Sequence, residues 1–442
     1  MLIKIVGLIV NILLIVDSLP PINKISSRRA YQLAKFFTVE GHIVHIVTSE
    51  KSTSSSQGGY ARDLSAVCKS VTYLSRRFIF GCTKINDSKN NQKFVNIRPT
   101  ETFHVLKSDN VFVSLLKTIK RHLVSFISVS DLYASKTNID LVSKIVDVEK
   151  IDLLISSYSP SFVHKIASKV KNNHMSLFWI ADFRDLWALN HNVALISFVR
   201  SLLVKYERKI IKNASLITSV SQGFIENLKS VHGQDRDYHL LTNGFDVTDL
   251  FYEIESVSPI VRSLFDDEVV ISYTGSLYES NQNIQAMLEA INECSPDNIK
   301  FIFAGSELRS KVFCSNKNVF VFNNLSSNDC NFVLCNSDYL LVVDWDGEYS
   351  GVIPAKIFDY MAANKQIVLH QPKEKVSELK TLLFDAGFSI SLSSVADWVT
   401  FIELLKSEGG ASLYVESDVD VQAYERHAQV QNLIKEVEKK NV

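Results

Sequence analysis

The segment over residues 350–360 carries residue types that bind phosphates and sugar hydroxyls. It reads Ser-Gly-Val-Ile-Pro-Ala-Lys-Ile-Phe-Asp-Tyr and follows an apolar run. Proline is favoured at the first position of a helix, so Pro354 predicts a helix start. Backbone amides at a helix start have no partner within the helix and can bind an anion. Here these amides belong to Ser350, Gly351 and Val352.

Two charged side chains in the same predicted helix fit this chemistry. Lys356 lies near the positive end of the helix dipole, where a cation is unfavourable unless an anion compensates it. Asp359 lies one turn further on, and its carboxylate can accept hydrogen bonds from the two hydroxyls of a ribose. The alternative is an ordinary helix start with a solvated lysine and aspartate. The convergence of these residues favours a ligand pocket.

Two more loops in the second half of the chain follow apolar runs. The turn Thr-Gly-Ser-Leu at residues 274–277 allows a phosphate to approach the backbone at Gly275, although such turns also serve as plain connectors. Asp344 and Asp346, with Glu348 nearby, offer carboxylates to a divalent cation. Acidic loops of this kind are common by chance, so we expect a solvated loop and no metal.

The first half contributes a charged group after an apolar run. Asp182, Arg184 and Asp185 follow the run, and they can shape one side of a cleft or simply form ion pairs. His164 lies near the start of a predicted helix, where it can serve as an acid or base or fill a structural role. Ligands of open parallel sheets bind beyond the carboxyl ends of the strands, which is where these residues are expected.

The elements that must position these residues begin with a strand–helix–strand unit. Residues 12–16 are apolar on both faces, as in a buried parallel strand, and residues 42–48 are expected to form the next strand. Between them, residues 29–40 have the periodicity of an amphipathic helix. Arg28 and Arg29 at its start can meet a phosphate or form a solvated helix end. A unit of this kind implies a parallel sheet with right-handed crossovers.

The same alternation continues along the chain and predicts an α/β protein. Further strands are expected at residues 151–156, 177–181, 216–220, 237–241, 269–274, 299–304, 319–322, 339–343 and 366–369. A single core rarely grows beyond about 250–300 residues, so 442 residues predict two domains. We place these Rossmann-like domains at 1–246 and 247–442. The last helix, at about 419–439, can cross back and pack on the first domain.

Composition excludes several classes of function. The chain has 47 Lys and Arg against 48 Asp and Glu, so it lacks the strong positive field of a nucleic-acid-binding protein. None of the six cysteines has zinc-binding spacing, and we interpret them as reduced thiols of a cytoplasmic protein. The apolar run at residues 1–16 is shorter than the ~20 residues that span a bilayer. A buried first strand is favoured there over a membrane anchor.

Taken together, the motifs resemble the GT-B glycosyltransferases, in particular the family-four-like group. The order and spacing of the similar segments carry the resemblance, and it covers most of the chain. The segments are 30–35, 41–44, 179–187, 207–208, 219–221, 243–246, 273–278 and 354–362.

The resemblance implies two Rossmann-like domains that face each other across a cleft. It implies transfer of a hexose-type sugar from a nucleotide-sugar donor to a saccharide acceptor, which is lipid-linked in the synthesis of cell-surface polysaccharide, with retention of configuration. No cofactor or obligatory metal is expected. On the residues and the resemblance together, we predict that His164, Asp182 and Arg184 are catalytic and that Arg28, Arg29 and Asp185 lie on the acceptor side. The predicted donor-binding residues are Gly275, Ser276, Leu277, Glu348, Ser350, Gly351, Val352, Lys356 and Asp359.

Three departures from the family pattern leave alternatives open. Gly351 stands where an acidic residue is usual, residues 280–283 lack the usual arginine and lysine, and the first loop lacks glycines. One alternative is a sugar-nucleotide epimerase on the same fold, and another is a non-catalytic relative that binds nucleotide sugars. We expect a cytoplasmic location, with peripheral contact to the inner membrane face through basic and apolar residues at 117–126.

Overall fold

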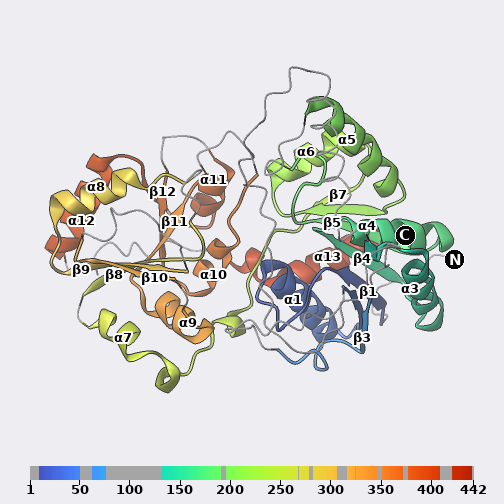
Figure 1. Cartoon of the computed structure of the whole chain (residues 1–442), viewed down its shortest axis with the longest axis horizontal. Coiled ribbons are helices and arrows are strands. Elements are labelled where there is room, and N and C mark those ends of the chain that lie inside the picture. Colours follow the sequence, from blue (N-terminus) through green and yellow to red (C-terminus); the bar gives the residue numbers. More distant parts are fainter. Residues whose placement is uncertain are drawn as a thin grey trace, which may run out of the picture.

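The structure is a computed structural model. It describes residues 9–49, 62–75, 132–190, 196–266, 268–277, 282–305, 316–323, 325–345, 351–371, 377–408 and 421–440. Two α/β domains lie side by side along the long axis of the molecule, each built around a parallel sheet (Figure 1). This is the two-domain α/β architecture that the alternating apolar runs predict.

The first domain has a seven-stranded sheet in the order β3-β2-β1-β4-β5-β6-β7. Its strands are β1 (Asn11–Val16), β2 (Ile43–Thr48), β3 (Ser70–Tyr73), β4 (Leu153–Tyr158), β5 (Phe178–Phe183), β6 (Leu216–Ser219) and β7 (Tyr238–Leu240). Its helices are α1 (Ile25–Val39), α3 (Lys136–Val148), α4 (Phe162–Asn173), α5 (Ser197–Ile211) and α6 (Gln222–His232). Every strand pairing in this sheet is parallel, for example Ile12 with Val44 and with Leu153.

The second domain has a six-stranded sheet in the order β10-β9-β8-β11-β12-β13. Its strands are β8 (Val269–Thr274), β9 (Ile299–Ala304), β10 (Val319–Phe322), β11 (Tyr339–Val343), β12 (Gln366–His370) and β13 (Ile390–Leu392). Its helices are α7 (Pro259–Arg262), α8 (Gln285–Cys294), α9 (Ser327–Asn336), α10 (Lys356–Ala362), α11 (Glu378–Asp385) and α12 (Val395–Glu408).

The apolar strands explain why helices cover both faces of each sheet. In β1, Leu13 and Ile15 belong to the core under α4, whereas Ile12, Leu14 and Val16 belong to the core under α1. Successive side chains of a strand point to opposite faces, so a strand that is apolar throughout must be covered on both. The sequence pattern and the layered architecture therefore have one cause.

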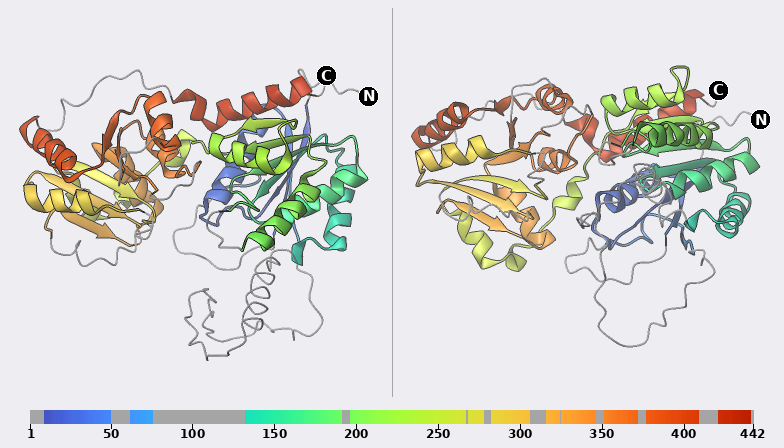
Figure 2. Two further views of the ribbon diagram at one scale, coloured as in Figure 1. Left: turned by 90° about the horizontal axis from the view of Figure 1, so that it is seen from above. Right: turned by 45° about the horizontal axis from the view of Figure 1, so that its top comes forward.

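The last helix, α13 (Arg426–Lys440), leaves the second domain and returns to the first. Its residues Val430, Leu433 and Val437 are buried in the core that contains β1 and α1. Figure 2 shows α13 lying along the first domain, near the start of the described chain. The chain thus crosses between the domains twice, once at residues 242–250 and once before α13.

Three predicted helix starts are displaced in the structure. α1 begins at Ile25 instead of residue 29, because the extended Lys24 already serves as the N-cap residue. α10 begins at Lys356, and Pro354 lies ahead of it in a turn in which the carbonyl of Pro354 accepts from the amide of Ile357. α13 begins at Arg426 instead of residue 419, after a short 3-10 turn at Gln422–Tyr424.

Candidate functional site

A pocket of about 370 Å³ lies between the two domains. One wall is the start of α1, the helix that follows the loop after β1. The opposite wall is formed by the loop after β8 and the start of α10. The lining residues are Ile25, Arg28, Arg29, Gln32, Asn243, Gly244, Thr274, Gly275, Ser276, Pro354, Ala355, Lys356, Asp359 and Arg426. The pocket thus lies at the carboxyl ends of parallel strands, where ligands of such sheets bind.

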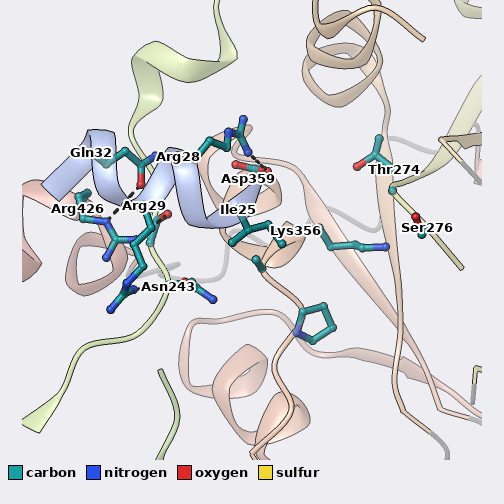
Figure 3. Close-up of a pocket in the computed structure, with 14 residues that line it drawn as sticks. Ile25, Arg28, Arg29, Gln32, Asn243, Thr274, Ser276, Lys356, Asp359 and Arg426 are labelled. Atoms are coloured by element: carbon teal, nitrogen blue, oxygen red, sulfur yellow. Dashed lines mark hydrogen bonds and ion pairs between the residues drawn. The ribbon is translucent and has the colours of Figure 1, made fainter. Parts of the chain in front are cut away.

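Lys356 forms the end of the pocket that belongs to the second domain, and it extends toward Thr274 and Ser276 (Figure 3). Its Nζ atom lies 3.5 Å from the centroid of the Tyr273 ring, a cation–π contact. Gly275 has a φ of +98°, and a Cβ at this position would lie 3.4 Å from Nζ. Because burial disfavours the charged form, the pKa of Lys356 is lowered to about 7.

Asp359, the predicted partner of a ribose, is held by a residue of the other domain. Nη1 of Arg28 on α1 donates to Oδ2 of Asp359 on α10 at 2.8 Å. Both side chains keep about a quarter of their surface exposed, at 26% and 23%. This ion pair lies between the two ends of the pocket (Figure 3). The predicted donor-side and acceptor-side residues are therefore in direct contact.

Arg29 and Asp182 form a buried ion pair beneath α1. Nη2 of Arg29 lies 2.9 Å from Oδ1 of Asp182, and both side chains are almost fully buried. Asp182 also accepts hydrogen bonds from the hydroxyls of Ser157 and Thr218. Burial by itself raises the pKa of Asp182, but the Arg29 guanidinium and these hydrogen bonds hold that pKa below its usual value. Asp182 acts on the pocket by fixing Arg29 and does not line the pocket.

The other predicted catalytic and acceptor-side residues lie outside the pocket lining. His164 has no exposed surface; its Nδ1 contacts the Ser156 hydroxyl at 2.7 Å, and burial lowers its pKa to about 3. Arg184 donates to the backbone carbonyl of Ser159 at 2.7 Å, and Asp185 is exposed. A catalytic role of these residues stays a prediction, since the structure does not bring them to the cavity.

Only some of the predicted donor residues line the pocket. Gly275, Ser276, Lys356 and Asp359 line the pocket. Leu277 is buried in the core of the second domain. Val352 packs against the core of the first domain, and the carbonyl of Gly351 accepts from the Ser221 hydroxyl at 2.7 Å. Glu348 and Ser350 lie outside the described residues. Gly351 and Val352 thus contact the other domain in place of the pocket, whereas Pro354 and Ala355 of the same segment line it.

This contact is a close approach of two backbones. A Cβ on Gly223 of α6 would lie 2.7 Å from the amide nitrogen of Gly351, which itself has a φ of +89°. Beside it, the carboxylate of Glu378 accepts from the backbone amides of Gln222 at 2.6 Å and Gly223 at 2.9 Å. Glu378 belongs to the second domain and accepts hydrogen bonds from backbone amides at the start of α6, which belongs to the first domain. It therefore ties the domains together.

Sequence reasoning missed the residues at the end of the pocket next to the two crossings between the domains, which we call the hinge end. Gln32, Asn243, Gly244 and Arg426 lie there, and the guanidinium of Arg426 donates to the carbonyl of Thr242. Residues 243–246 stood out only as one of the segments similar to the glycosyltransferases, with no role assigned at the site. Arg426 gave no signal in the sequence, because the predicted helix began at residue 419, and only the return of α13 to the first domain brings it to the cavity.

Within the described ranges, no group of His, Cys, Asp and Glu is arranged to hold a metal ion. In the same part of the chain, no helix has both the length and the apolar character needed to cross a bilayer.

Solved structures resemble this one, although no family model and no curated protein matches the sequence. HepE from Anabaena, solved with UDP, aligns over 97% of this chain and 100% of its own, with 11% identity and a TM-score of 0.60. A glycosyltransferase from Rickettsia africae aligns over 98% of both chains, with 12% identity and a TM-score of 0.58. The chain has the GT-B fold.

The same GT-B architecture occurs in proteins of more than one activity. A putative UDP-N-acetylglucosamine 2-epimerase from Listeria monocytogenes aligns over 98% of this chain and 96% of its own, with 11% identity and a TM-score of 0.52. At such low identity the likeness establishes the GT-B fold alone.

Proposed function

We propose that the chain is a glycosyltransferase that binds a nucleotide-sugar donor in the interdomain pocket. The observation that carries the proposal is the placement of Lys356, Gly275 and Asp359 around one cavity between the domains. A cation and a glycine turn suit a diphosphate, and a carboxylate one helical turn away suits a ribose. The UDP bound to HepE and the nucleotide sugar in the name of the Listeria protein fit a pocket of this chemistry.

In the proposed reaction, the bond between the anomeric carbon and the diphosphate oxygen breaks. The electron pair leaves with the nucleoside diphosphate, and the acceptor hydroxyl oxygen forms the new bond to the anomeric carbon while its proton passes to the leaving phosphate oxygen. Lys356, protonated when a diphosphate lies beside it, stabilises the negative charge of the leaving group. This step needs no metal. We propose retention of configuration and a hexose donor.

The experiment incubates the purified protein with a panel of nucleotide sugars, with and without a lipid-linked saccharide acceptor, and follows released nucleotide. Release that depends on the acceptor supports transfer. Conversion of the donor sugar without release of nucleotide supports the epimerase alternative. Binding without turnover supports a non-catalytic nucleotide-sugar-binding protein, so the last two outcomes both overturn the proposal.

For the acceptor we propose a lipid-linked saccharide at the inner membrane face. The predicted contact at residues 117–126 lies outside the described residues. A described surface supports the same idea: on α5, Phe198 is 66% exposed and Leu202, one turn later, is 42% exposed. Lys205, Lys209 and Lys212 continue the exposed face. Apolar side chains beside lysines suit the headgroup region of an anionic bilayer.

Co-sedimentation with vesicles tests this contact. We expect the protein to bind vesicles of phosphatidylglycerol and not vesicles of phosphatidylcholine. The double variant Phe198→Ser, Leu202→Ser should bind more weakly, whereas Met175→Ser, at another exposed apolar side chain of the same domain, serves as the matched control. Equal binding of both variants to anionic vesicles would remove α5 from the proposal.

A further inference from the structure

The hinge end of the pocket contains a buried guanidinium that has no carboxylate partner among the described residues. Arg426 is 1% exposed and lines the cavity. All its hydrogen bonds go to neutral oxygens. The acceptors are Oε1 of Gln32 at 3.3 Å, the carbonyl of Thr242 at 3.1 Å, Oε1 of Gln429 at 2.5 Å and the carbonyl of Gly244 at 3.5 Å.

The carboxylates in this region are already paired with other cations. Asp182 accepts from Nη2 of Arg29 at 2.9 Å and from Nε at 3.3 Å. Two carboxylates in the first crossing between the domains have partners as well: Asp246 pairs with Lys35, and Asp249 pairs with Arg62. Among the described residues, Asp182 is thus the only carboxylate hydrogen-bonded to either of the buried guanidiniums Arg29 and Arg426, and it bonds to Arg29 alone. Burial and the neighbouring Arg29 lower the pKa of Arg426.

The helix ends around this region add to the positive potential. Arg426 is the first residue of α13, a helix of 15 residues, and Arg28 and Arg29 lie near the start of α1, also of 15 residues. The first turn of neither helix contains an acidic residue. A cation at a helix N-terminus is opposed by the helix dipole, and burying a charge without a counter-ion is costly. Both costs are offset if an anion occupies the pocket.

The two ends of the pocket are separate in space. In Figure 3, Lys356 points toward Thr274 and Ser276 at one end, whereas Gln32, Arg29 and Arg426 gather at the other, with the Arg28–Asp359 pair between them. A diphosphate beside Lys356 therefore leaves the hinge end available. The cavity volume is within the usual range for small-ligand sites.

We propose that the hinge end, around Arg426, Gln32 and Asn243, is a second anion site that binds a phosphate or carboxylate group of the acceptor. This inference rests on the proposed function, because it assigns the Lys356 end to the donor. The ligand is then an anionic saccharide or a phosphorylated acceptor, and a neutral sugar alone leaves Arg426 uncompensated.

Calorimetry with UDP-saturated protein tests the second site. Inorganic phosphate and glucuronate are titrated separately, and the tighter of the two identifies a phosphate or a carboxylate acceptor. We expect at least one to bind in the presence of saturating UDP. Lys356→Met should weaken UDP binding and leave this second binding event in place. Competition of both anions with UDP, or no binding of either, would overturn the proposal.

Two variants of the hinge end complete the test. Arg426→Gln should lower the affinity for the anion about tenfold or more, equivalent to ~1.4 kcal/mol, while the affinity for UDP stays the same. Because removal of a buried arginine can impair folding, Gln429→Glu provides an independent variant. It places a carboxylate against Nη1 of Arg426, at the cost of the hydrogen bonds that Nε2 of Gln429 donates to Thr242 and Asn243, so the protein should lose the second anion.

The outcomes separate this inference from the proposed function. If wild-type protein fails to bind UDP or any nucleotide sugar, the proposed function is lost. If UDP binds but Gln429→Glu still takes up phosphate and glucuronate as tightly as the wild type does, only the second anion site is lost.

Discussion

Arg28 and Asp359 join the two domains through an ion pair of 2.8 Å, although the two residues lie 331 positions apart in the chain. The carboxylate that we propose to bind ribose is therefore held in place by an arginine of the opposite domain. A donor that binds Asp359 must share the carboxylate with Arg28. Donor binding and the relative position of the domains are therefore coupled.

We expect Asp359→Asn to weaken the binding of UDP about tenfold, because an amide is a poorer acceptor for ribose hydroxyls than a carboxylate. The free energy of unfolding should change by less than about 1 kcal/mol, since the ion pair is partly exposed. Calorimetry and urea unfolding measure the two quantities. As a control, Arg28→Gln removes the ion pair and keeps the carboxylate; unchanged UDP affinity in Asp359→Asn would remove the ribose role.

Lys356 should make nucleotide binding depend on pH. Its pKa of about 7 means that much of the lysine is neutral at pH 8, whereas a bound diphosphate favours the charged form. UDP affinity should therefore fall as pH rises from 6 to 8.5, and binding at pH 8 should take up a proton. Calorimetry in buffers of different ionisation enthalpy measures this uptake, and Lys356→Met should abolish it.

The same lysine affects stability with a defined sign. In the unfolded chain its pKa is near the ordinary 10.4, so between pH 7 and 10.4 the unfolded state binds more protons than the folded state. Its contribution therefore increases the free energy of unfolding as pH rises through this window. Urea unfolding at pH 7 and 9 should show a larger gain in the wild type than in Lys356→Met. An equal gain would contradict the lowered pKa.

Gly223→Ala should destabilise the contact between the domains. In an exposed helix this change usually stabilises by up to about 1 kcal/mol. Here the new Cβ would lie 2.7 Å from the amide of Gly351, so we expect a loss of about 1–3 kcal/mol and a larger radius of gyration. Thermal unfolding and small-angle X-ray scattering measure both. Ser230→Ala, on the exposed face of the same helix, is the control.

His164 should contribute to acid sensitivity. Its folded-state pKa of about 3 lies below the ordinary 6.5, so the unfolded state binds the extra proton between these values. Its stabilising effect is complete above pH 6.5 and decreases as pH falls, by up to about 1.4 kcal/mol per pH unit. His164→Asn should be less stable at pH 7 and show a shallower loss between pH 6 and 4. An inflection in the rate profile near pH 6.5 that disappears in this variant would contradict the lowered pKa and support catalysis by His164.

Local pattern determined the elements and part of the site. The runs around Leu13 and Leu341 are apolar on both faces, which only a sheet covered on both sides satisfies. Gly275, Lys356 and Asp359 could be assigned to one pocket because they follow two strands of one parallel sheet, whose carboxyl ends share an edge. These inferences need only neighbouring residues and the rules of parallel sheets.

Tertiary structure decided which residues those elements meet. Gly351 and Val352 looked like ligand contacts, but they pack on the first domain because Gly223 leaves room for the backbone. Arg426 reaches the cavity only because α13 returns to the core around β1. Periodicity predicts that a residue is buried, but it does not predict which residues it packs against. Contacts between residues hundreds of positions apart, such as Arg28 with Asp359, arise from the packing of the two domains.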